Sequence, residues 1–408
     1  MTSRFSQLSV EVKQYLLVTA NYWAFTLTDG ALRMLVVLHF HQLGYSPLQI
    51  AMLFLFYEIF GVITNLLGGW LGARWGLNRT MNAGLALQVL ALAMLLVPVS
   101  MLTVIWVMAA QALSGIAKDL NKMSAKSSLK LLVPGHAQDK LYKWVALLTG
   151  SKNALKGVGF FLGGLLLSVL GFHGAVLAMA LALLLVWLAS MALLRKDFGK
   201  ASSKPKFTEI FSKSHAVNIL SAARLFLFGA RDVWFVVALP IFLAANLGWD
   251  FWQVSGFLAL WVIGYGFVQS IAPYFTGKKS GQVPDGKTAL RWALPLAIIP
   301  AAIAILMSQG VDPSKVLVIG LMLFGALFAI NSSLHSYLIL SYAREDGVSM
   351  DVGFYYMANA MGRLVGTVLS GWVFQAYGLP ACLWVSCGFL VITACISIAL
   401  PRHAFAIK

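Results

Sequence analysis

The chain contains 408 residues, of which 60% are hydrophobic and 11% are charged, and its mean hydropathy is +0.82. About a quarter of the residues in soluble domains are charged, so this composition excludes a soluble domain and indicates an integral membrane protein. The formal net charge is +16, a value that would also be typical of a basic nucleic-acid-binding protein.

Twelve segments are long and apolar enough to cross a bilayer, which takes about 20 residues. If the N-terminus lies in the cytoplasm, nearly all loop lysines and arginines are cytoplasmic, and Lys315 alone lies outside. This is the distribution of the positive-inside rule, so topology accounts for the net charge and we expect no nucleic-acid partner. Both termini are then predicted to be cytoplasmic. The segments are residues 14–41, 47–72, 80–101, 103–125, 141–170, 173–194, 216–245, 251–272, 289–307, 315–342, 352–377 and 381–400.

A polar segment at residues 195–215 divides the chain into an N-terminal half, residues 1–194, and a C-terminal half, residues 216–408. We interpret this segment as a basic cytoplasmic linker between two six-helix bundles. The halves share a weak repeat, since Leu43-Gly44-Tyr45 and Leu247-Gly248-Trp249 occupy the same outer turn of each. Two related six-helix bundles predict the all-α major facilitator fold, which binds substrate near the midplane between them.

Two short stretches resemble motifs of that superfamily. In the loop after the second helix, Gly69, Leu71, Arg74 and Gly76 match the gating signature, but Ala73 replaces its acidic residue. We therefore expect Gly69, Arg74 and Gly76 to form the gating loop without the usual acidic contact, with Arg74 anchoring it. Residues 159–164 resemble an antiporter motif with Phe160 in place of its proline, although close helix packing explains these glycines equally well.

Charged residues inside the spanning segments are the main indication of function. Each costs about 2.5–3.5 kcal/mol on insertion scales, so such residues usually line a polar pathway. Four acids accompany eight cations, and this excess predicts an interior that binds an anion. The cations are Arg33, Lys118, Lys122, Lys152, Lys156, Arg224, Arg231 and Arg363, and the acids are Asp29, Glu58, Asp119 and Asp232.

From these we predict a substrate-binding set and a set of proton-coupling candidates. The binding set is Arg33, Lys118, Lys122, Lys152, Lys156, Arg231 and Arg363, together with Asn359. The coupling candidates are Asp29, Glu58 and Asp119, because a carboxyl group in a low dielectric can titrate near neutrality.

Several local alternatives stay open at this point. Asp29 and Arg33 lie one helical turn apart and can simply neutralise each other. Arg231 and Asp232 are adjacent, diverge by about 100° on a helix and are not expected to face the same point. Lys126 and Lys130 extend the lysine stripe of Lys118 and Lys122, and we expect both to reach the headgroups.

Polar residues between 331 and 336 can bind substrate or link helices, and Tyr337, Tyr355 and Tyr356 are expected to pack or to lie at the membrane interface. No zincin, hydrolase or phosphate-loop motif is present, so we predict neither catalytic residues nor a cofactor. Three cysteines, all in the last helix, give no metal-binding pattern, and we expect no metal site.

Residues 21–33 and 118–128 resemble the ArsJ-type organoarsenical efflux permeases of bacteria, and the resemblance extends along the whole chain. It implies a secondary transporter of the bacterial inner membrane that exports 1-arseno-3-phosphoglycerate and confers arsenate resistance. Glyceraldehyde-3-phosphate dehydrogenase makes this compound when it uses arsenate in place of phosphate, which implies a functional link to that enzyme. We expect a monomeric secondary transporter of the antiporter type, not an enzyme, with coupling to protons, exchange for inorganic phosphate and uniport all open. The alternative function is an organophosphate/phosphate exchanger of the same superfamily.

Overall fold

The computed structural model describes residues 10–44, 53–133, 137–194, 199–201, 214–249, 251–277 and 283–402. Every regular element in these ranges is helical, and none is a strand. Most of the predicted linker at 195–215 and the first outer loop beyond Gly44 lie outside the described residues.

Two compact units make up the chain. Unit 1 comprises Met1–Trp144, Ser151–Phe211 and Ala343–Met357, and unit 2 comprises Val145–Gly150, Ser212–Tyr342 and Ala358–Lys408. Each unit therefore takes in a short segment from the other half of the chain. The predicted division at residues 195–215 stays a prediction.

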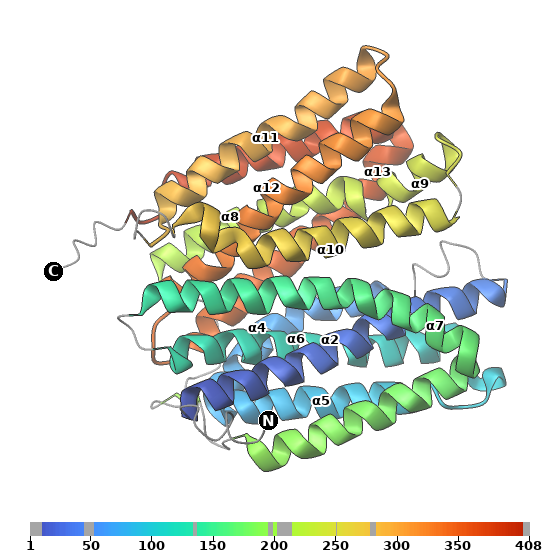
Figure 1. Cartoon of the computed structure of the whole chain (residues 1–408), viewed down its shortest axis with the longest axis vertical. Coiled ribbons are helices and arrows are strands. Elements are labelled where there is room, and N and C mark those ends of the chain that lie inside the picture. Colours follow the sequence, from blue (N-terminus) through green and yellow to red (C-terminus); the bar gives the residue numbers. More distant parts are fainter. Residues whose placement is uncertain are drawn as a thin grey trace. The chain divides into compact units, whose positions relative to one another are not determined.

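Unit 1 is built around helix α6, which packs against α2, α4 and α5 (Figure 1). Helix α7 is long because it joins two membrane-length helices at Gly171, whose φ of +66° interrupts the helix and favours a residue without a side chain. The helices of unit 1 are α2 (Val10–Gln42), α4 (Leu55–Trp75), α5 (Leu77–Met94), α6 (Val104–Leu132) and most of α7 (Gln138–Leu193), with the short 3₁₀ helix η1 (Val99–Met101).

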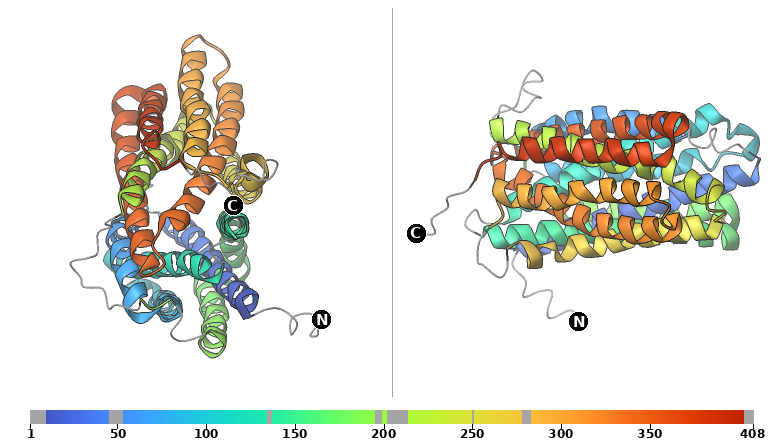
Figure 2. Two further views of the ribbon diagram at one scale, coloured as in Figure 1. Left: turned by 90° about the vertical axis from the view of Figure 1, so that its left-hand side faces the viewer. Right: turned by 90° about the horizontal axis from the view of Figure 1, so that it is seen from above.

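Unit 2 is built in the same way around α12, which packs against α8, α10 and α11 (Figures 1 and 2). Helix α13 bends at Gly378, where φ is +77°, and its first turns belong to unit 1. The helices are α8 (His215–Phe235), α9 (Ala238–Ala245), α10 (Phe251–Thr276), α11 (Gly286–Ser308), α12 (Pro313–Tyr342) and α13 (Val348–Ser397).

The internal repeat is visible in the backbone. Gly171 and Gly378 divide the last two predicted segments of each half, and the turns at Gly44 and Gly248, predicted to lie outside, also have positive φ angles, +85° and +67°. Positive φ is costly for residues with a side chain, so the same geometry recurs where the sequence repeats.

One predicted segment, 216–245, is two helices, because the chain breaks between α8 and α9. The break exposes backbone amides, and the Ser370 hydroxyl accepts hydrogen bonds from the amides of Val237 and Ala238 at 3.4 and 3.1 Å. A break inside a bilayer is tolerated where protein groups satisfy the backbone, and Ser370 provides that here.

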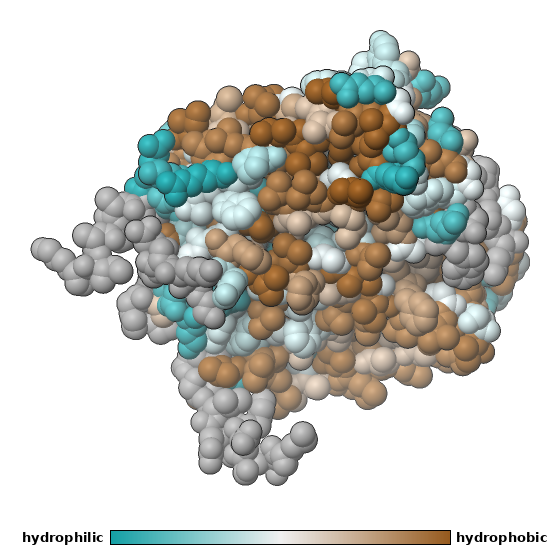
Figure 3. Space-filling view, turned by 45° about the horizontal axis from the view of Figure 1, so that its top comes forward, coloured by the Kyte–Doolittle hydropathy of each residue, from teal (hydrophilic) through white to brown (hydrophobic). Residues whose placement is uncertain are grey.

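The outer faces of the helices are apolar. Seven helices in the described part of the chain are long and apolar enough to span a membrane, and α7 and α13 are each about twice that length. Hydrophobic side chains dominate the visible face in Figure 3, and large ones such as Ile105, Phe161 and Ile319 are exposed. This surface matches a lipid environment.

Candidate functional site

The helices that carry the predicted site approach each other through glycines. In unit 1, a methyl group built at Gly30 of α2 would lie 2.9 Å from the Lys156 carbonyl oxygen of α7. One built at Gly159 would lie 2.7 Å from the Leu27 carbonyl oxygen, and Gly163 meets the backbone of α2 in the same way. Gly159 and Gly163 of the antiporter-like stretch therefore serve close helix packing, which places the lysines of α7 beside α2.

Unit 2 repeats this contact between α8 and α13. A methyl group at Gly366 would lie 2.7 Å from the Gly229 carbonyl oxygen and 2.9 Å from the Asp232 Cβ. Gly362 is in equally close contact with the backbone of Leu225. The first helix of each half thus packs closely against its fifth, and both helices of each pair carry charged residues.

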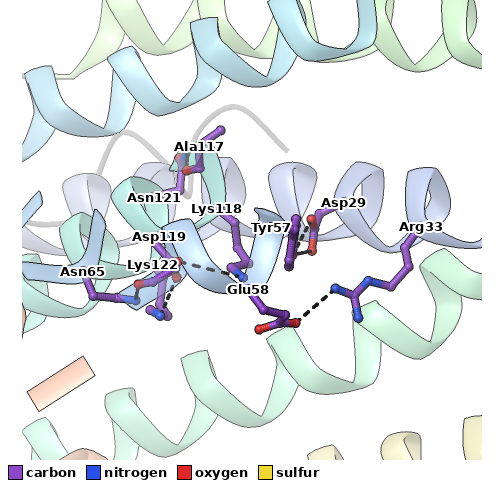
Figure 4. A network of polar contacts seen from close by, with 11 residues as sticks. Asp29, Arg33, Tyr57, Glu58, Asn65, Ala117, Lys118, Asp119, Asn121 and Lys122 are labelled. Atoms are coloured by element: carbon purple, nitrogen blue, oxygen red, sulfur yellow. Dashed lines mark hydrogen bonds and ion pairs between the residues drawn. The ribbon is translucent and has the colours of Figure 1, made fainter. Parts of the chain in front are cut away.

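Helices α4 and α6 approach in a similar way, and this contact positions Tyr57 and Asp119. A methyl group at Gly115 of α6 would lie 2.9 Å from the Tyr57 carbonyl oxygen, and one at Gly61 of α4 would lie 3.1 Å from an Asp119 oxygen. Both Tyr57 and Asp119 are buried. The side chains of α2, α4 and α6 consequently meet in one polar network (Figure 4).

The first part of this network holds Asp29 and Arg33 with different partners. The Tyr57 hydroxyl donates to the Asp29 carboxylate, at 2.9 Å from Oδ1 and 3.2 Å from Oδ2. Arg33 instead forms an ion pair with Glu58, with 3.4 Å between Nη2 and Oε1. Mutual neutralisation of Asp29 and Arg33 was one reading of the sequence, and the described residues do not pair in that way.

The lysine stripe of α6 forms the second part. The Lys122 ammonium lies 2.6 Å from Asp119 Oδ1, and the Lys118 ammonium lies 3.9 Å from Oδ2. Lys118 also lies over the Tyr57 ring at 3.7 Å. At this distance the cation is attracted by the ring quadrupole.

Tyr356, from the part of α13 that belongs to unit 1, lies beside this stripe. Its ring centroid is 4.7 Å from the Lys122 ammonium and 4.9 Å from that of Lys126. Lys126 is only 4% exposed, so the expectation that it extends to the headgroups is wrong. Its aliphatic stem follows the protein interior because an aromatic ring is within reach there.

Lys152 and Lys156 lie half-buried on α7. The Lys152 ammonium donates to the Asn153 side-chain oxygen at 3.3 Å, and the Lys156 ammonium lies 5.7 Å from the centroid of the Phe160 ring. They are on the same unit as the α6 stripe, but the contacts just described join neither of them to Asp29, Glu58 or Asp119.

In unit 2, one acid joins two predicted cations. Asp232 is fully buried and accepts hydrogen bonds from Arg231 Nε at 2.5 Å and from Arg363 Nε at 3.1 Å. The prediction that Arg231 and Asp232 cannot converge is wrong, because the long arginine side chain folds back onto its neighbour. The Arg231 guanidinium lies 5.0 Å from the Phe228 ring centroid.

Arg224 forms a second polar group in this unit. Its Nε donates to the Asn359 side chain at 2.8 Å, and its Nη1 lies 3.3 Å from both the carbonyl and hydroxyl oxygens of Ser332. Gln269 donates to the same hydroxyl at 3.1 Å, and the Phe228 ring lies 3.8 Å from the guanidinium. Ser332 therefore links α8, α10 and α12, and Asn359 orients Arg224.

Of the residues predicted to form the gating loop, Gly69 and Arg74 lie within α4, and Gly76 connects α4 to α5. Gly76 has a φ of +98°, which favours glycine, and its amide donates to the Gly72 carbonyl oxygen at 3.0 Å. Arg74 lies 5.2 Å from the Trp70 ring centroid, and the Ser349 hydroxyl donates to the Gly69 carbonyl oxygen at 2.7 Å. The role of this loop in gating stays a prediction.

Chemically, these clusters are suited to holding an anion. In unit 1, Arg33, Lys118, Lys122 and Lys126 accompany three carboxylates, and in unit 2 Arg224, Arg231 and Arg363 accompany Asp232. The sequence reading overlooked Tyr57 and treated Tyr356 as packing. The sequence does contain a signal for Tyr57, because this aromatic residue directly precedes Glu58, a charged residue inside a predicted spanning segment.

Comparison with known proteins agrees with this architecture. Residues 15–350 match the sequence model of the Major Facilitator Superfamily, whereas no curated protein sequence matches the chain. The E. coli fucose:proton symporter superposes with a TM-score of 0.75 at 14% identity, over 97% of this chain and 100% of that one. The human organic anion transporter TETRAN gives 0.76 at 15% identity, over 96% and 100%. A bacterial homologue of the iron transporter ferroportin gives 0.74 at 13% identity, over 96% and 99%.

At these identities the similar structures establish the fold alone, and they confirm the predicted all-α arrangement. The family match covers most of the chain and assigns its class. The chain belongs to the Major Facilitator Superfamily, and it is a multi-pass membrane transporter rather than an enzyme.

Proposed function

We propose that this transporter exports an organic anion, 1-arseno-3-phosphoglycerate, across the bacterial inner membrane and so confers resistance to arsenate. Both termini lie in the cytoplasm in this proposal, and the protein works as a monomeric antiporter. The observation that carries it is the excess of cations over carboxylates in both charged clusters.

Lys126 adds to the cations that the sequence placed in the interior. The buried ammonium of Lys126 joins Lys118 and Lys122, and these three lysines have Asp119 as the acid on their own helix. An excess of positive charge is costly in a low dielectric, so a site where cations outnumber carboxylates is suited to a ligand of opposite sign. A phosphate and an arsenate ester on one small molecule supply two or more negative charges.

The residue types also fit this ligand. Guanidinium groups form paired, charge-assisted bonds with tetrahedral oxyanions, which is the role we assign to Arg33, Arg231 and Arg363. Lys118, Lys122, Lys152 and Lys156 act as point charges, and Asn359 acts through Arg224. Pentavalent arsenic resembles phosphorus in its oxyanions and needs no thiols, and Cys382, Cys387 and Cys395 all lie beyond the bend of α13.

The stretches that resemble ArsJ-type permeases are also the stretches that build the network. Asp29 and Arg33 lie in the first stretch, 21–33, and the α6 lysines lie in the second, 118–128. Asp29, Glu58 and Asp119 border these cations, which supports them as proton-coupling candidates.

An assay of bacterial resistance to arsenate and arsenite tests the proposed substrate directly. The chain is expressed in an arsenic-sensitive bacterium together with a glyceraldehyde-3-phosphate dehydrogenase, and growth is measured in arsenate and in arsenite. We expect protection against arsenate that requires both proteins, and none against arsenite. Equal protection against arsenite, or protection without the dehydrogenase, would contradict the proposed substrate.

The alternative is an organophosphate/phosphate exchanger. It is favoured by the two arginines on Asp232, because a pair of guanidinium groups also fits inorganic phosphate. Such a protein would exchange phosphate across vesicles and give no arsenate resistance in the assay above.

A further inference from the structure

Tyr57 makes three contacts that no other described residue of the network combines. Its hydroxyl donates to Asp29, and its ring lies 3.7 Å from the Lys118 ammonium and 4.7 Å from the Arg33 guanidinium carbon. The side chain is fully enclosed, since the residue is 2% exposed and α6 meets its backbone at Gly115. One rigid side chain therefore touches one acid and two cations (Figure 4).

These contacts separate two groups that would otherwise attract each other. Asp29 and Arg33 lie four residues apart on α2, a spacing at which side chains of opposite charge commonly pair. Within the described part of the chain, the Asp29 carboxylate is held by the phenol and makes no ion pair. The Tyr57 hydroxyl donates its one proton to the Asp29 carboxylate, which therefore has a partner that is not a cation.

Arg33 is held differently. Its ion pair with Glu58 is long, at 3.4 Å, and about a quarter of each side chain is exposed. A pair of this kind is weak because solvent screens it, so an incoming anion can replace the carboxylate. A buried pair between Arg33 and Asp29 would be much harder to displace.

We propose that Tyr57 is a positioning residue that keeps Asp29 away from Arg33, and so keeps Arg33 and Lys118 available to the phosphate-like groups of the substrate. The hydroxyl occupies the carboxylate, and the ring holds both cations by cation–π attraction. The inference rests on the proposed function, because it gives Arg33 and Lys118 an anionic ligand.

The test measures equilibrium binding of 3-phosphoglycerate, a stable analogue, to the purified full-length protein by isothermal titration calorimetry. Tyr57→Phe keeps the ring and removes the hydrogen bond, so Asp29 becomes free to pair with Arg33. We expect binding to weaken about tenfold, the lower end of the loss of one charge-assisted contact. Equilibrium binding is chosen because it does not depend on coupling to protons.

The double variant Tyr57→Phe with Asp29→Asn distinguishes positioning from a structural role. Asparagine cannot form the competing ion pair, so we expect the dissociation constant to return to within about twofold of the wild type. Tyr57→Leu removes the ring as well, and Asp29→Asn should not rescue it. Tyr377→Phe, at a tyrosine that is 71% exposed on α13, is the matched control and should bind as the wild type does.

The pattern of results separates the two claims. If the wild type binds and the double variant stays as weak as Tyr57→Phe, the positioning role is wrong and the proposed function is untouched. Full binding by Tyr57→Phe alone would also overturn that role. If the wild type binds no 3-phosphoglycerate, the proposed function fails and the inference fails with it.

Discussion

Asp232 and Glu58 are both carboxylates beside arginines, but they hold their partners with very different strength. Asp232 is completely buried and accepts hydrogen bonds from two arginines, whereas Glu58 is partly exposed and its ion pair with Arg33 is long, at 3.4 Å. A buried carboxylate fixes its cations, and a partly exposed one can be displaced. At the scale of residues, we therefore regard Arg33 as an exchangeable ligand and Asp232 as a fixed part of unit 2.

The cations themselves give the first prediction. Lys118→Ala, Lys156→Ala and Arg231→Ala should each weaken transport about ten- to a hundredfold, because each removes a charge-assisted contact of about 1.5–3 kcal/mol. Initial rates are measured in everted vesicles that contain equal amounts of each variant. The substrate is made outside the vesicles from radiolabelled arsenate, glyceraldehyde-3-phosphate, NAD⁺ and the dehydrogenase.

Lys143→Ala is the matched control for Lys156→Ala, since Lys143 lies on the same helix with a half-exposed side chain paired to Asp139. It should transport at a rate close to that of the wild type. If Lys143→Ala lost transport and the other three variants kept it, the anion site would lie elsewhere.

At the scale of helices, small residues set where the charged side chains lie. Gly163 of α7 touches the backbone of α2, whereas the neighbouring Gly164 has only the Leu38 side chain at an ordinary 3.6 Å. Each of the two glycines lies between a leucine and a glycine in the sequence, but their surroundings in the fold differ. They therefore offer a direct test of the close contact between α2 and α7.

Gly163→Ala should lower the midpoint of thermal unfolding in detergent, because overpacking a close contact costs about 1–3 kcal/mol. Gly164→Ala should leave the midpoint unchanged or raise it slightly, since alanine is favoured over glycine within a helix by up to about 1 kcal/mol. In unit 2, Gly362→Ala and Gly371→Ala should repeat the contrast, because Gly362 meets the Leu225 backbone and Gly371 has open space. Equal midpoints for Gly163→Ala and Gly164→Ala would refute the packing interpretation.

The helices were predictable because a span of about 20 apolar residues is a strong local signal, and the cation excess followed from the same segments. The choice of partners was not predictable. Lys126 was expected at the headgroups, yet Tyr356 draws it inward, and Arg231 folds back onto the adjacent Asp232. Sequence spacing shows which residues share a helix face. It does not show that Lys126 meets Tyr356 of another helix, or that the long side chain of Arg231 can bend back to its neighbour.

For the transporter as a whole, Glu58 and Asp119 bear on the return step of the transport cycle, after the substrate has been released. An obligate exchanger carries an anion in both directions, so its cations always have a ligand. An exporter that exchanges its anion for protons returns without an anion, and its cations then need partners within the protein. Glu58 beside Arg33 and Asp119 beside Lys118 and Lys122 are partners of this kind, which favours an exporter that returns without an anion.

We therefore predict that export needs no phosphate on the opposite side. Everted vesicles are loaded either with inorganic phosphate or with an equal concentration of a sulfonate buffer, and uptake of the arsenylated substrate is followed as described above. The initial rates should agree within about twofold, because carboxylates rather than phosphate occupy the cations during the return step. A rate that rises tenfold or more with internal phosphate would instead identify an exchanger. Glu58→Gln then provides the internal check. The neutral amide removes the carboxylate beside Arg33 in the anion-free state, so the rate without internal phosphate should fall while the rate with phosphate is partly restored.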